Sequence, residues 1–334
     1  MKKYILLVFL TIGYVHIYAQ KKTNPPPKKT NSKTPAKDDG KEPLTYSVLR
    51  DNTKINFLST GIDPFDMQVG NTFYMGLSAN AEALYHNFFI HTEYNYHYVS
   101  ADIGGSNRID GESIYTPTNS NDFEILGGYF FTRVVDGKVP ITLKVTGNGS
   151  GGHTTYYTKV DAQYEKFYGV ECGVAKGVKL MFAEGQFNAT DAFSGASSSF
   201  NGAFSTNMEY TWLYLGGSLG KMFDVAANFS EYGNKTGRCL KRIYAHVIIP
   251  LQSKLDDIYW LEGYGSSNPI YHKYVIDNTV PKGKVGFRIG FSQDFYSQII
   301  SGGGEFVLMP GLNGMSPMFR LKFQLGLNKI FGGG

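Results

Sequence analysis

The stretch Phe319-Arg320-Leu321-Lys322-Phe323-Gln324-Leu325-Gly326-Leu327-Asn328 decides the fold of this chain. Its odd positions are apolar, and its even positions are polar or glycine. Successive side chains of a β-strand point to opposite faces, so a period of two predicts a strand with one apolar and one polar face. An aromatic residue, Phe331, follows almost at the end of the chain.

The same alternation recurs along the chain. Apolar side chains occupy every second position, and mostly polar or small ones lie between them. The stretches that show this pattern are 73–83, 88–98, 123–131, 158–165, 223–230 and 285–292. A single stretch of this kind is weak evidence, but their number in one chain predicts an all-β protein.

The N-terminus has the features of a cleaved secretory signal peptide. Lys2 and Lys3 precede a mostly apolar run at 5–15, and Ala19 offers a small residue at a cleavage point. We therefore expect residues 1–19 to be removed on export. After them no apolar run approaches the roughly 20 residues of a membrane helix. A membrane protein with this sequence could therefore span only as a closed barrel.

Residues 20–43 form a linker rich in proline and lysine. The stretch 21–43 holds five prolines and seven lysines, which cannot build a core, so we expect an extended and disordered periplasmic segment. It is either a tether that contacts an anionic envelope polymer or another envelope protein, or a spacer without a partner. The net charge of +4 resides in this segment and the leader, so it gives no reason to expect nucleic-acid binding.

Tight and long connections alternate between the expected strands. The tight ones are 84–86, 134–137, 176–177 and 218–220, and the long ones are 100–121, 148–156, 190–203 and 233–240. This rhythm is typical of a transmembrane antiparallel β-barrel, which residues 44–334 would form with about 12 strands (range about 10–14). The expected strands are 52–59, 71–83, 87–99, 122–133, 138–147, 157–173, 178–189, 204–217, 221–232, 241–250, 284–295 and 318–331.

The structure of two segments is left undecided by this pattern of strands and connections. Residues 251–283 would be a long excursion at the periplasmic end or would hide a further hairpin. The run 306–309 is either a strand or an apolar flap in the last outer loop. A soluble β-sandwich is the rival fold, although it would not explain the alternation of tight and long connections.

With its signal peptide, its alternating strands over 52–331 and its terminal strand, the chain resembles the outer-membrane β-barrel proteins of Gram-negative envelopes. The resemblance implies location in the outer membrane, contact with its lipid, and recognition by the barrel-assembly machinery. It also implies an assembly signal in the last strand, although Phe331 is followed by three glycines. The residues of that signal are Phe319, Leu321, Phe323, Leu325, Leu327 and Phe331.

Polar residues in phase with the strands are expected to line the barrel lumen. They are His91, Glu93, Asn95, His97, Glu124, Lys159, Asp161, Gln163, Glu165, Arg288, Arg320, Lys322 and Gln324. One arrangement places a basic wall opposite an acidic wall, which would set up a field across an open pore. In the other arrangement these charges pair across a filled lumen.

The sequence holds no catalytic motif, and we expect no cofactor and no metal. His91 and His97 would be roughly 20 Å apart on one strand, too far to share a metal ion. Cys172 alternates in phase with Val170 and Val174, which favours an outward-facing residue over a disulfide with Cys239.

Three functions fit this sequence. The first is a polar-lined, porin-like pore that transports small solutes across the cell envelope. The second is a structural or interaction barrel that docks envelope or secretion-machinery partners through its linker and loops. An outer-membrane hydrolase is the third, and no residue spacing points to it.

Overall fold

A computed structural model describes residues 45–327 of this chain. The gaps within this range are 54, 71, 103–107, 110–111, 116–119, 150–151, 231, 263–269, 277–283, 296–299 and 312–313. The expected signal peptide (1–19), the linker (20–43) and Phe331 lie outside the described residues.

The described residues form an all-β structure. Its strands are β1 (Tyr46–Asn52), β2 (Phe57–Gly70), β3 (Thr72–Tyr85), β4 (Phe88–Asp102), β5 (Arg108–Ile109), β6 (Glu112–Tyr115), β7 (Ser120–Gly149), β8 (Gly152–Asp191), β9 (Ser197–Phe229), β10 (Gly233–Leu255), β11 (Ile258–Glu262), β12 (Ile270–Ile276), β13 (Gly286–Phe295), β14 (Ile300–Gly311) and β15 (Gly314–Gly326).

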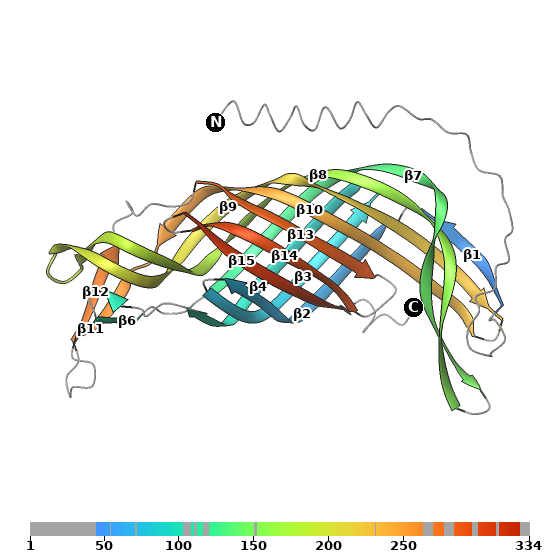
Figure 1. Cartoon of the computed structure of the whole chain (residues 1–334), viewed down its shortest axis with the longest axis horizontal. Coiled ribbons are helices and arrows are strands. Elements are labelled where there is room, and N and C mark those ends of the chain that lie inside the picture. The colour runs from blue at the N-terminus through green and yellow to red at the C-terminus, as the bar shows by residue number, and fades with distance from the viewer. Residues whose placement is uncertain are drawn as a thin grey trace. The chain divides into compact units, whose positions relative to one another are not determined.

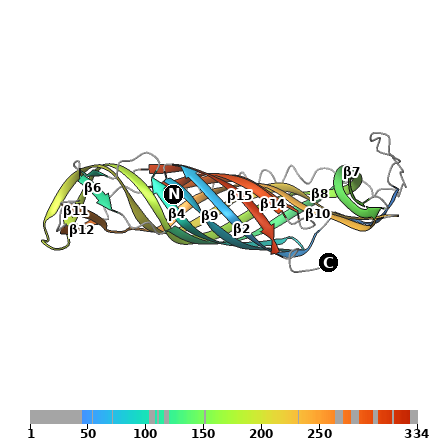
Figure 2. The ribbon, with the colours of Figure 1, turned by 90° about the horizontal axis from the view of Figure 1, so that it is seen from below.

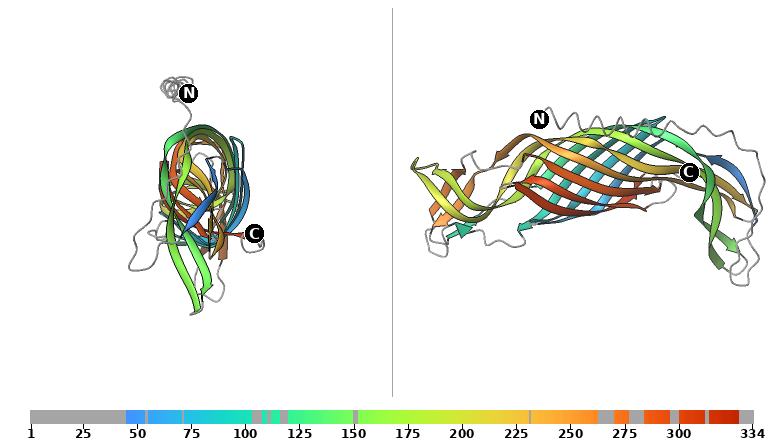
Figure 3. Two further views of the ribbon diagram at one scale, coloured as in Figure 1. Left: turned by 90° about the vertical axis from the view of Figure 1, so that its right-hand side faces the viewer. Right: turned by 45° about the horizontal axis from the view of Figure 1, so that its top comes forward.

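Ten of these strands close into an antiparallel barrel (Figure 1). Their order around the barrel is β9-β10-β13-β14-β15-β2-β3-β4-β7-β8, and β8 pairs with β9 to complete the ring. Seen nearly along its axis, the barrel is a continuous ring of strands (Figure 3, left). The predicted closed barrel is therefore confirmed, at the low end of the predicted range of strands.

Alternation sorts the side chains as the sequence predicts. On β13 the side chains of Phe287, Ile289 and Phe291 are exposed on the outside, whereas Arg288 between them is buried. On β15 Phe319 and Phe323 are exposed and Arg320 is buried. On these two strands the apolar face thus points out, and the charged face points in.

Three of the predicted tight turns are wrong. Residues 134–137, 176–177 and 218–220 all lie inside long strands, so six expected strands merge into β7, β8 and β9. Two of the glycines in these predicted turns make room for the backbone of a neighbouring strand instead. A Cβ on Gly177 would lie 2.3 Å from the Asn121 carbonyl oxygen, and one on Gly220 would lie 2.0 Å from that of Lys241.

The Asp136–Gly137 pair marks a bulge in β7 and does not end the strand. The register with β8 shifts between Val134 and Lys138, and Gly137 adopts a positive φ of 135°. Glycine adopts this conformation without steric cost, and some types of bulge place a glycine with positive φ at this point.

β2 lies later in the chain than the expected strand at 52–59. The register between β2 and β3 shifts between Asp63 and Asp66, so Pro64 lies in a bulge. Proline is tolerated at such a site because no ladder hydrogen bond is required of it. The sequence leaves open whether 306–309 is a strand or a flap, because the three consecutive glycines of β14, 302–304, hide the alternation. β14 is a strand of the barrel wall.

The segment after β10 lies at the end of the barrel opposite the one predicted. Six expected strands merge into the three strands β7, β8 and β9, and the loss of three turns reverses the direction of the strands that follow. The connection from β10 to β13 therefore leaves the barrel at the end far from β1 and from the end of β15. It contains a hairpin of β11 and β12, which pairs with β6 and β8 outside the ring (Figure 2).

Apolar side chains fill the barrel interior near the end where β1 lies. Phe130 stacks between Phe89 and Phe167, with ring centroids 5.2 and 4.3 Å apart. Strand register continues this layer around the ring through Leu84, Met222 and Leu240. All six side chains are at most 3% exposed. We call this group the Phe130 layer.

A second apolar layer closes the interior near the other end. Tyr74 donates a hydrogen bond from its hydroxyl to the carbonyl oxygen of Leu180 on β8. Tyr210 stacks on Trp212 with ring centroids 3.8 Å apart. The other buried members of this layer, which we call the Trp212 layer, are Met181, Met208, Ile248, Val307, Met309 and Met318.

Beyond the Phe130 layer the wall divides into two ribbons. β8 and β9 pair no further than Glu165 and Met222, and β1 then takes the place of β8 beside β9. One ribbon is the β7–β8 hairpin over 138–164, and the other is β1 with residues 222–238 of β9 and β10. We call the two ribbons together the annex, which Figure 1 shows beyond the barrel at right.

The annex has a hydrophobic core of its own. Its members are Ile141, Leu143, Val145, Val160, Ala162, Phe223, Val225, Ala227, Phe229 and Cys239. On β9 these are odd-numbered positions, which continue the outward face of the barrel at Leu215 and Leu219. The outer face of the wall therefore becomes the inside of the annex. Cys172 is exposed on the barrel wall, Cys239 is buried here, and both are free thiols.

Replacement of Phe89 by alanine is expected to lower the free energy of unfolding by about 3–5 kcal/mol, because it opens the Phe130 layer. Phe88→Ala is the matched control, since that neighbouring side chain is 63% exposed, and we expect a loss below about 1 kcal/mol. Chemical denaturation of the two purified variants measures both values. Equal losses would contradict the assignment of the two faces.

Candidate functional site

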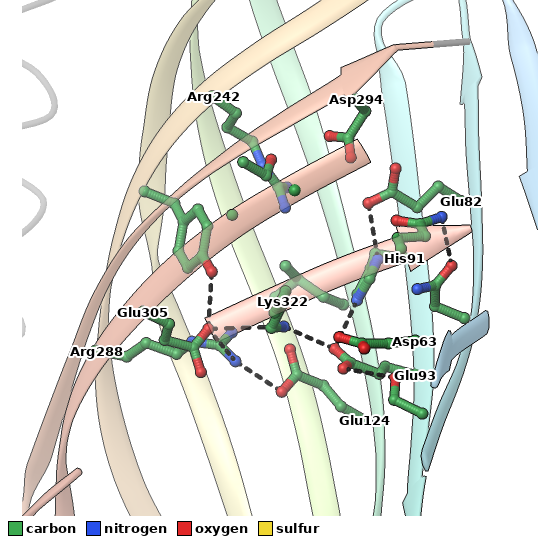
Figure 4. Close-up of a pocket in the computed structure, with 18 residues that line it drawn as sticks. Asp63, Glu82, His91, Glu93, Glu124, Arg242, Arg288, Asp294, Glu305 and Lys322 are labelled. Atoms are coloured by element: carbon green, nitrogen blue, oxygen red, sulfur yellow. Dashed lines mark hydrogen bonds and ion pairs between the residues drawn. The ribbon is translucent and has the colours of Figure 1, made fainter. Parts of the chain in front are cut away.

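A layer of charged side chains crosses the barrel between the two apolar layers. Strand alternation directs these side chains inward from β2, β3, β4, β7, β8, β10, β13, β14 and β15. Figure 4 shows part of this layer, in which carboxylates and cations from opposite walls point toward one another. We call it the charged layer.

Arg320 bonds three side chains of the charged layer. Its Nε donates to Asp66 on β2 over 2.6 Å, and its Nη2 donates to Asn95 over 2.6 Å and to Glu93, both on β4. Lys322 donates to the second oxygen of Glu93 over 2.8 Å. Because β15 and β4 are separated by two strands, these bonds tie the wall across its interior.

Two histidines of β4 join the same network. His91 bonds Glu82 through Nδ1 over 2.9 Å, and its Nε2 lies 3.3 Å from Glu93. His97 bonds Asp66 over 3.0 Å through Nε2. His91 is thus held between a carboxylate of β3 and one of its own strand, and His97 is bonded to a carboxylate of β2.

A second network centres on Glu171 of β8. It accepts hydrogen bonds from Ser218 over 2.6 Å and from Arg242 over 3.2 Å, and it bonds His246 over 2.8 Å. Arg288 donates from Nε to Nδ1 of His246 over 3.2 Å. Both ring nitrogens of His246 are therefore engaged, so the cluster lacks the free base that would activate Ser218 as a nucleophile.

Arg288 links the two networks to the far wall. Its Nη1 donates to Glu124 on β7 over 2.7 Å and lies 3.9 Å from Glu305 on β14. Its guanidinium also stacks over the ring of Tyr214, 4.1 Å from the centroid. The hydroxyl of Tyr244 donates to Glu305 over 2.7 Å.

The cavity left among these side chains is small. It has a volume of about 40 Å³, and half of its lining residues are charged, including Asp63, Glu82, Asp294 and Lys322. A buried water needs about 10–15 Å³ by this measure, so the cavity has room for a few waters. The charged layer is therefore a packed cross-section of the barrel.

Most of the expected lumen residues point into the interior. His91, Glu93, Asn95, His97, Arg288 and Arg320 are buried, and Glu124, Lys322 and Gln324 are partly buried. The charges pair across a filled interior, which is the second of the two arrangements that the sequence left open.

Four of the expected lumen residues lie at the annex instead. Lys159 and Asp161 are exposed, because Val160 and Ala162 between them face the annex core. Gln163 donates its backbone N–H to Asp51 of β1 over 2.7 Å. Glu165 is buried at the point where β8 leaves β9, and it accepts a hydrogen bond from Thr53 over 2.9 Å. The predicted acidic wall of Asp161 and Glu165 is wrong.

Several members of the charged layer were absent from the sequence-based set. Asp66 and Gln68 follow the Pro64 bulge, and Glu305 follows three glycines, so no regular alternation surrounds them. Arg242, Tyr244 and His246 do alternate with apolar neighbours, and that pattern could have identified them. The remaining members include Glu82, Asp122, Glu171, Lys179 and Asp294.

No known protein family, no curated protein and no solved structure matches this chain. Within the described ranges, no group of three or more His, Cys, Asp or Glu residues is arranged to hold a metal ion. No helix in the part of the chain that the structure describes is long and apolar enough to cross a bilayer. The function therefore has to be argued from the geometry.

Arg320→Met is expected to lower the free energy of unfolding by about 3–5 kcal/mol, because it leaves Asp66 and Glu93 buried without their cation. Lys159→Met removes an exposed lysine from the annex and should change stability by about 0.5 kcal/mol at most. Denaturant titration of both variants checks this difference. A small effect at Arg320 would contradict the role of the charged layer in stability.

Proposed function

We propose that this chain is an integral outer-membrane β-barrel protein with a sealed interior, and that it acts as a structural and interaction protein. The observation that carries this proposal is the distribution of side chains: a band of apolar residues is exposed on the outside of the barrel, and a layer of charged residues is buried inside it. A water-soluble domain has the opposite arrangement.

The exposed apolar residues surround the whole barrel. Every one of the ten strands contributes at least one, and together they form a band. In the order of the chain, examples are Phe65, Leu77, Ile90, Ile125, Val174, Leu219, Ile243, Ile289, Phe306 and Phe323. Soluble monomers rarely expose contiguous apolar patches larger than a few hundred Å². A bilayer would cover this band, and a closed barrel pairs the backbone groups that cross it.

The proposed orientation follows from the strand directions. β2 starts and β15 ends at the same end of the barrel, as the pairing of Gly61 with Gly326 requires. In bacterial outer-membrane barrels an even strand number and short periplasmic turns are the rule. By analogy with that class we place this end, and the annex with it, in the periplasm. Residues 20–43 would enter from there, after export through the signal peptide and insertion by the barrel-assembly machinery.

The filled interior favours an interaction role over a pore. The Phe130 layer and the Trp212 layer bury their side chains almost completely, and the charged layer leaves about 40 Å³. A solute would have to displace paired charges, at a cost of several kcal/mol per uncompensated ion. The solute pore is the second candidate, since a polar layer does run across the barrel.

Ile289→Arg is expected to destabilise the protein in lipid vesicles by about 2–4 kcal/mol, the cost of arginine on the lipid face near the bilayer midplane. Tyr157→Arg changes a residue of the annex that is 68% exposed, so it should have little effect. Folding titrations of both variants into vesicles measure the costs. An equally small cost for both would count against a membrane location.

In planar bilayers the purified protein is expected to give no conductance steps, because packed side chains block the interior. A porin measured in the same bilayers serves as the positive control. Regular single-channel steps from the unmodified protein would overturn the sealed interior and establish the pore instead.

A further inference from the structure

The annex has two free strand edges that lie next to each other. β7 pairs with β4 only as far as Tyr129, and β10 pairs with β13 only from Cys239 onward. Among the described residues no strand pairs with the outer edge of β7 after that point, or with the outer edge of β10 over 233–238. Unpaired N–H and C=O groups on such edges are ready to accept another strand.

The edge of β7 has the features of a site for strand addition. Pro140 has no N–H to donate, as is typical of a residue that faces an open edge. Thr142 and Lys144 follow at the two-residue period, so their backbone groups point to the same side. Both side chains are exposed.

A cleft of about 200 Å³ lies between the two edges. Ile141, Leu143 and Phe223 form its apolar floor, and residues 234–238 of β10 line its other side. Apolar cavities of about 150 Å³ hold a molecule of the size of benzene. The cleft can therefore take up one apolar side chain of an added strand.

The rim of the cleft is basic. Lys144 lines it from β7, and Lys235 lines it from β10. In the part of the chain that the structure describes, neither lysine forms an ion pair. Arg238, which also lines the cleft, donates to Asp224 over 2.9 Å. Two uncompensated cations beside an apolar slot favour a partner with carboxylates on either side of an apolar residue.

We propose that this cleft binds an extended acidic segment of a partner protein by strand addition to β7. The segment would insert one apolar side chain over Ile141, Leu143 and Phe223, and its flanking carboxylates would meet Lys144 and Lys235. This proposal rests on the proposed function in one respect: the proposed membrane orientation places binding of the partner in the periplasm. The lysine-rich stretch 21–43 of the chain itself has the wrong charge for this cleft.

The test measures binding of a labelled peptide of alternating valine and glutamate to the full chain purified in detergent. A counterpart with lysine in place of glutamate should bind at least about tenfold more weakly, because of charge repulsion at the rim. A peptide N-methylated at alternate backbone nitrogens should lose binding, because it cannot form the ladder.

Two double variants of equal charge change locate the site. Lys144→Glu with Lys235→Glu is expected to weaken binding of the acidic peptide by about tenfold or more. Lys159→Glu with Lys166→Glu, on exposed positions of β8 outside the cleft, should leave binding unchanged. A third variant, Thr142→Trp, fills the cleft from an exposed position and should abolish binding of the acidic peptide.

Any of three results overturns the proposal: no binding of the acidic peptide, equal losses in the two double variants, or full binding of the N-methylated peptide. Because the assay uses detergent-purified protein, its failure would leave the membrane location untouched. A failed vesicle titration of Ile289→Arg would in turn leave the cleft untouched.

Discussion

The structure depends on the pairing of charges that the barrel has taken out of water. An isolated ion in such an interior would cost several kcal/mol or more, so each cation must lie against carboxylates and each carboxylate against donors. Arg320 meets this requirement with Asp66 of the adjacent strand β2 and with Glu93 and Asn95 of β4, which lies beyond β2 and β3. The same bonds that compensate the charge therefore hold β15 and β4 at a fixed distance across the interior.

The apolar layers above and below depend on this spacing. The stacked rings of Phe89, Phe130 and Phe167 fill the width that the charged layer sets, and Arg242 lies over the Phe89 ring, 4.4 Å from its centroid. Shielded by these layers, the ion pairs lie in a medium of low dielectric constant, where they interact strongly. Polar and apolar cross-sections thus stabilise each other, and together they leave little free volume.

The fold class was predictable because alternation is a local property. The stretches around Phe287 and Phe323 separate their two faces without reference to any other strand. The strand count was less accessible, since it depends on what each glycine does. Gly177 and Gly220 look like turn residues, but in the structure they admit the backbone of a neighbouring strand. Only the pairing partner distinguishes these two roles.

The interior site was predictable only in part, for a related reason. His91, Glu93 and Arg320 lie on regular strands, and their phase alone directs them inward. Asp66 and Glu305 lie beside a bulge and a run of glycines, where the phase is lost. Lys159 and Asp161 keep a regular phase, yet the strand leaves the barrel before it reaches them. The two-residue alternation of a sequence cannot reveal where a strand passes from the barrel into the annex.

The annex and the barrel are made of the same strands. β7, β8, β9 and β10 pass from one into the other without a loop, and the register of β9 with β10 is unbroken across the junction. A force applied to the annex is consequently transmitted along continuous hydrogen-bonded ladders into the wall. A partner attached to the annex is therefore coupled rigidly to the barrel wall.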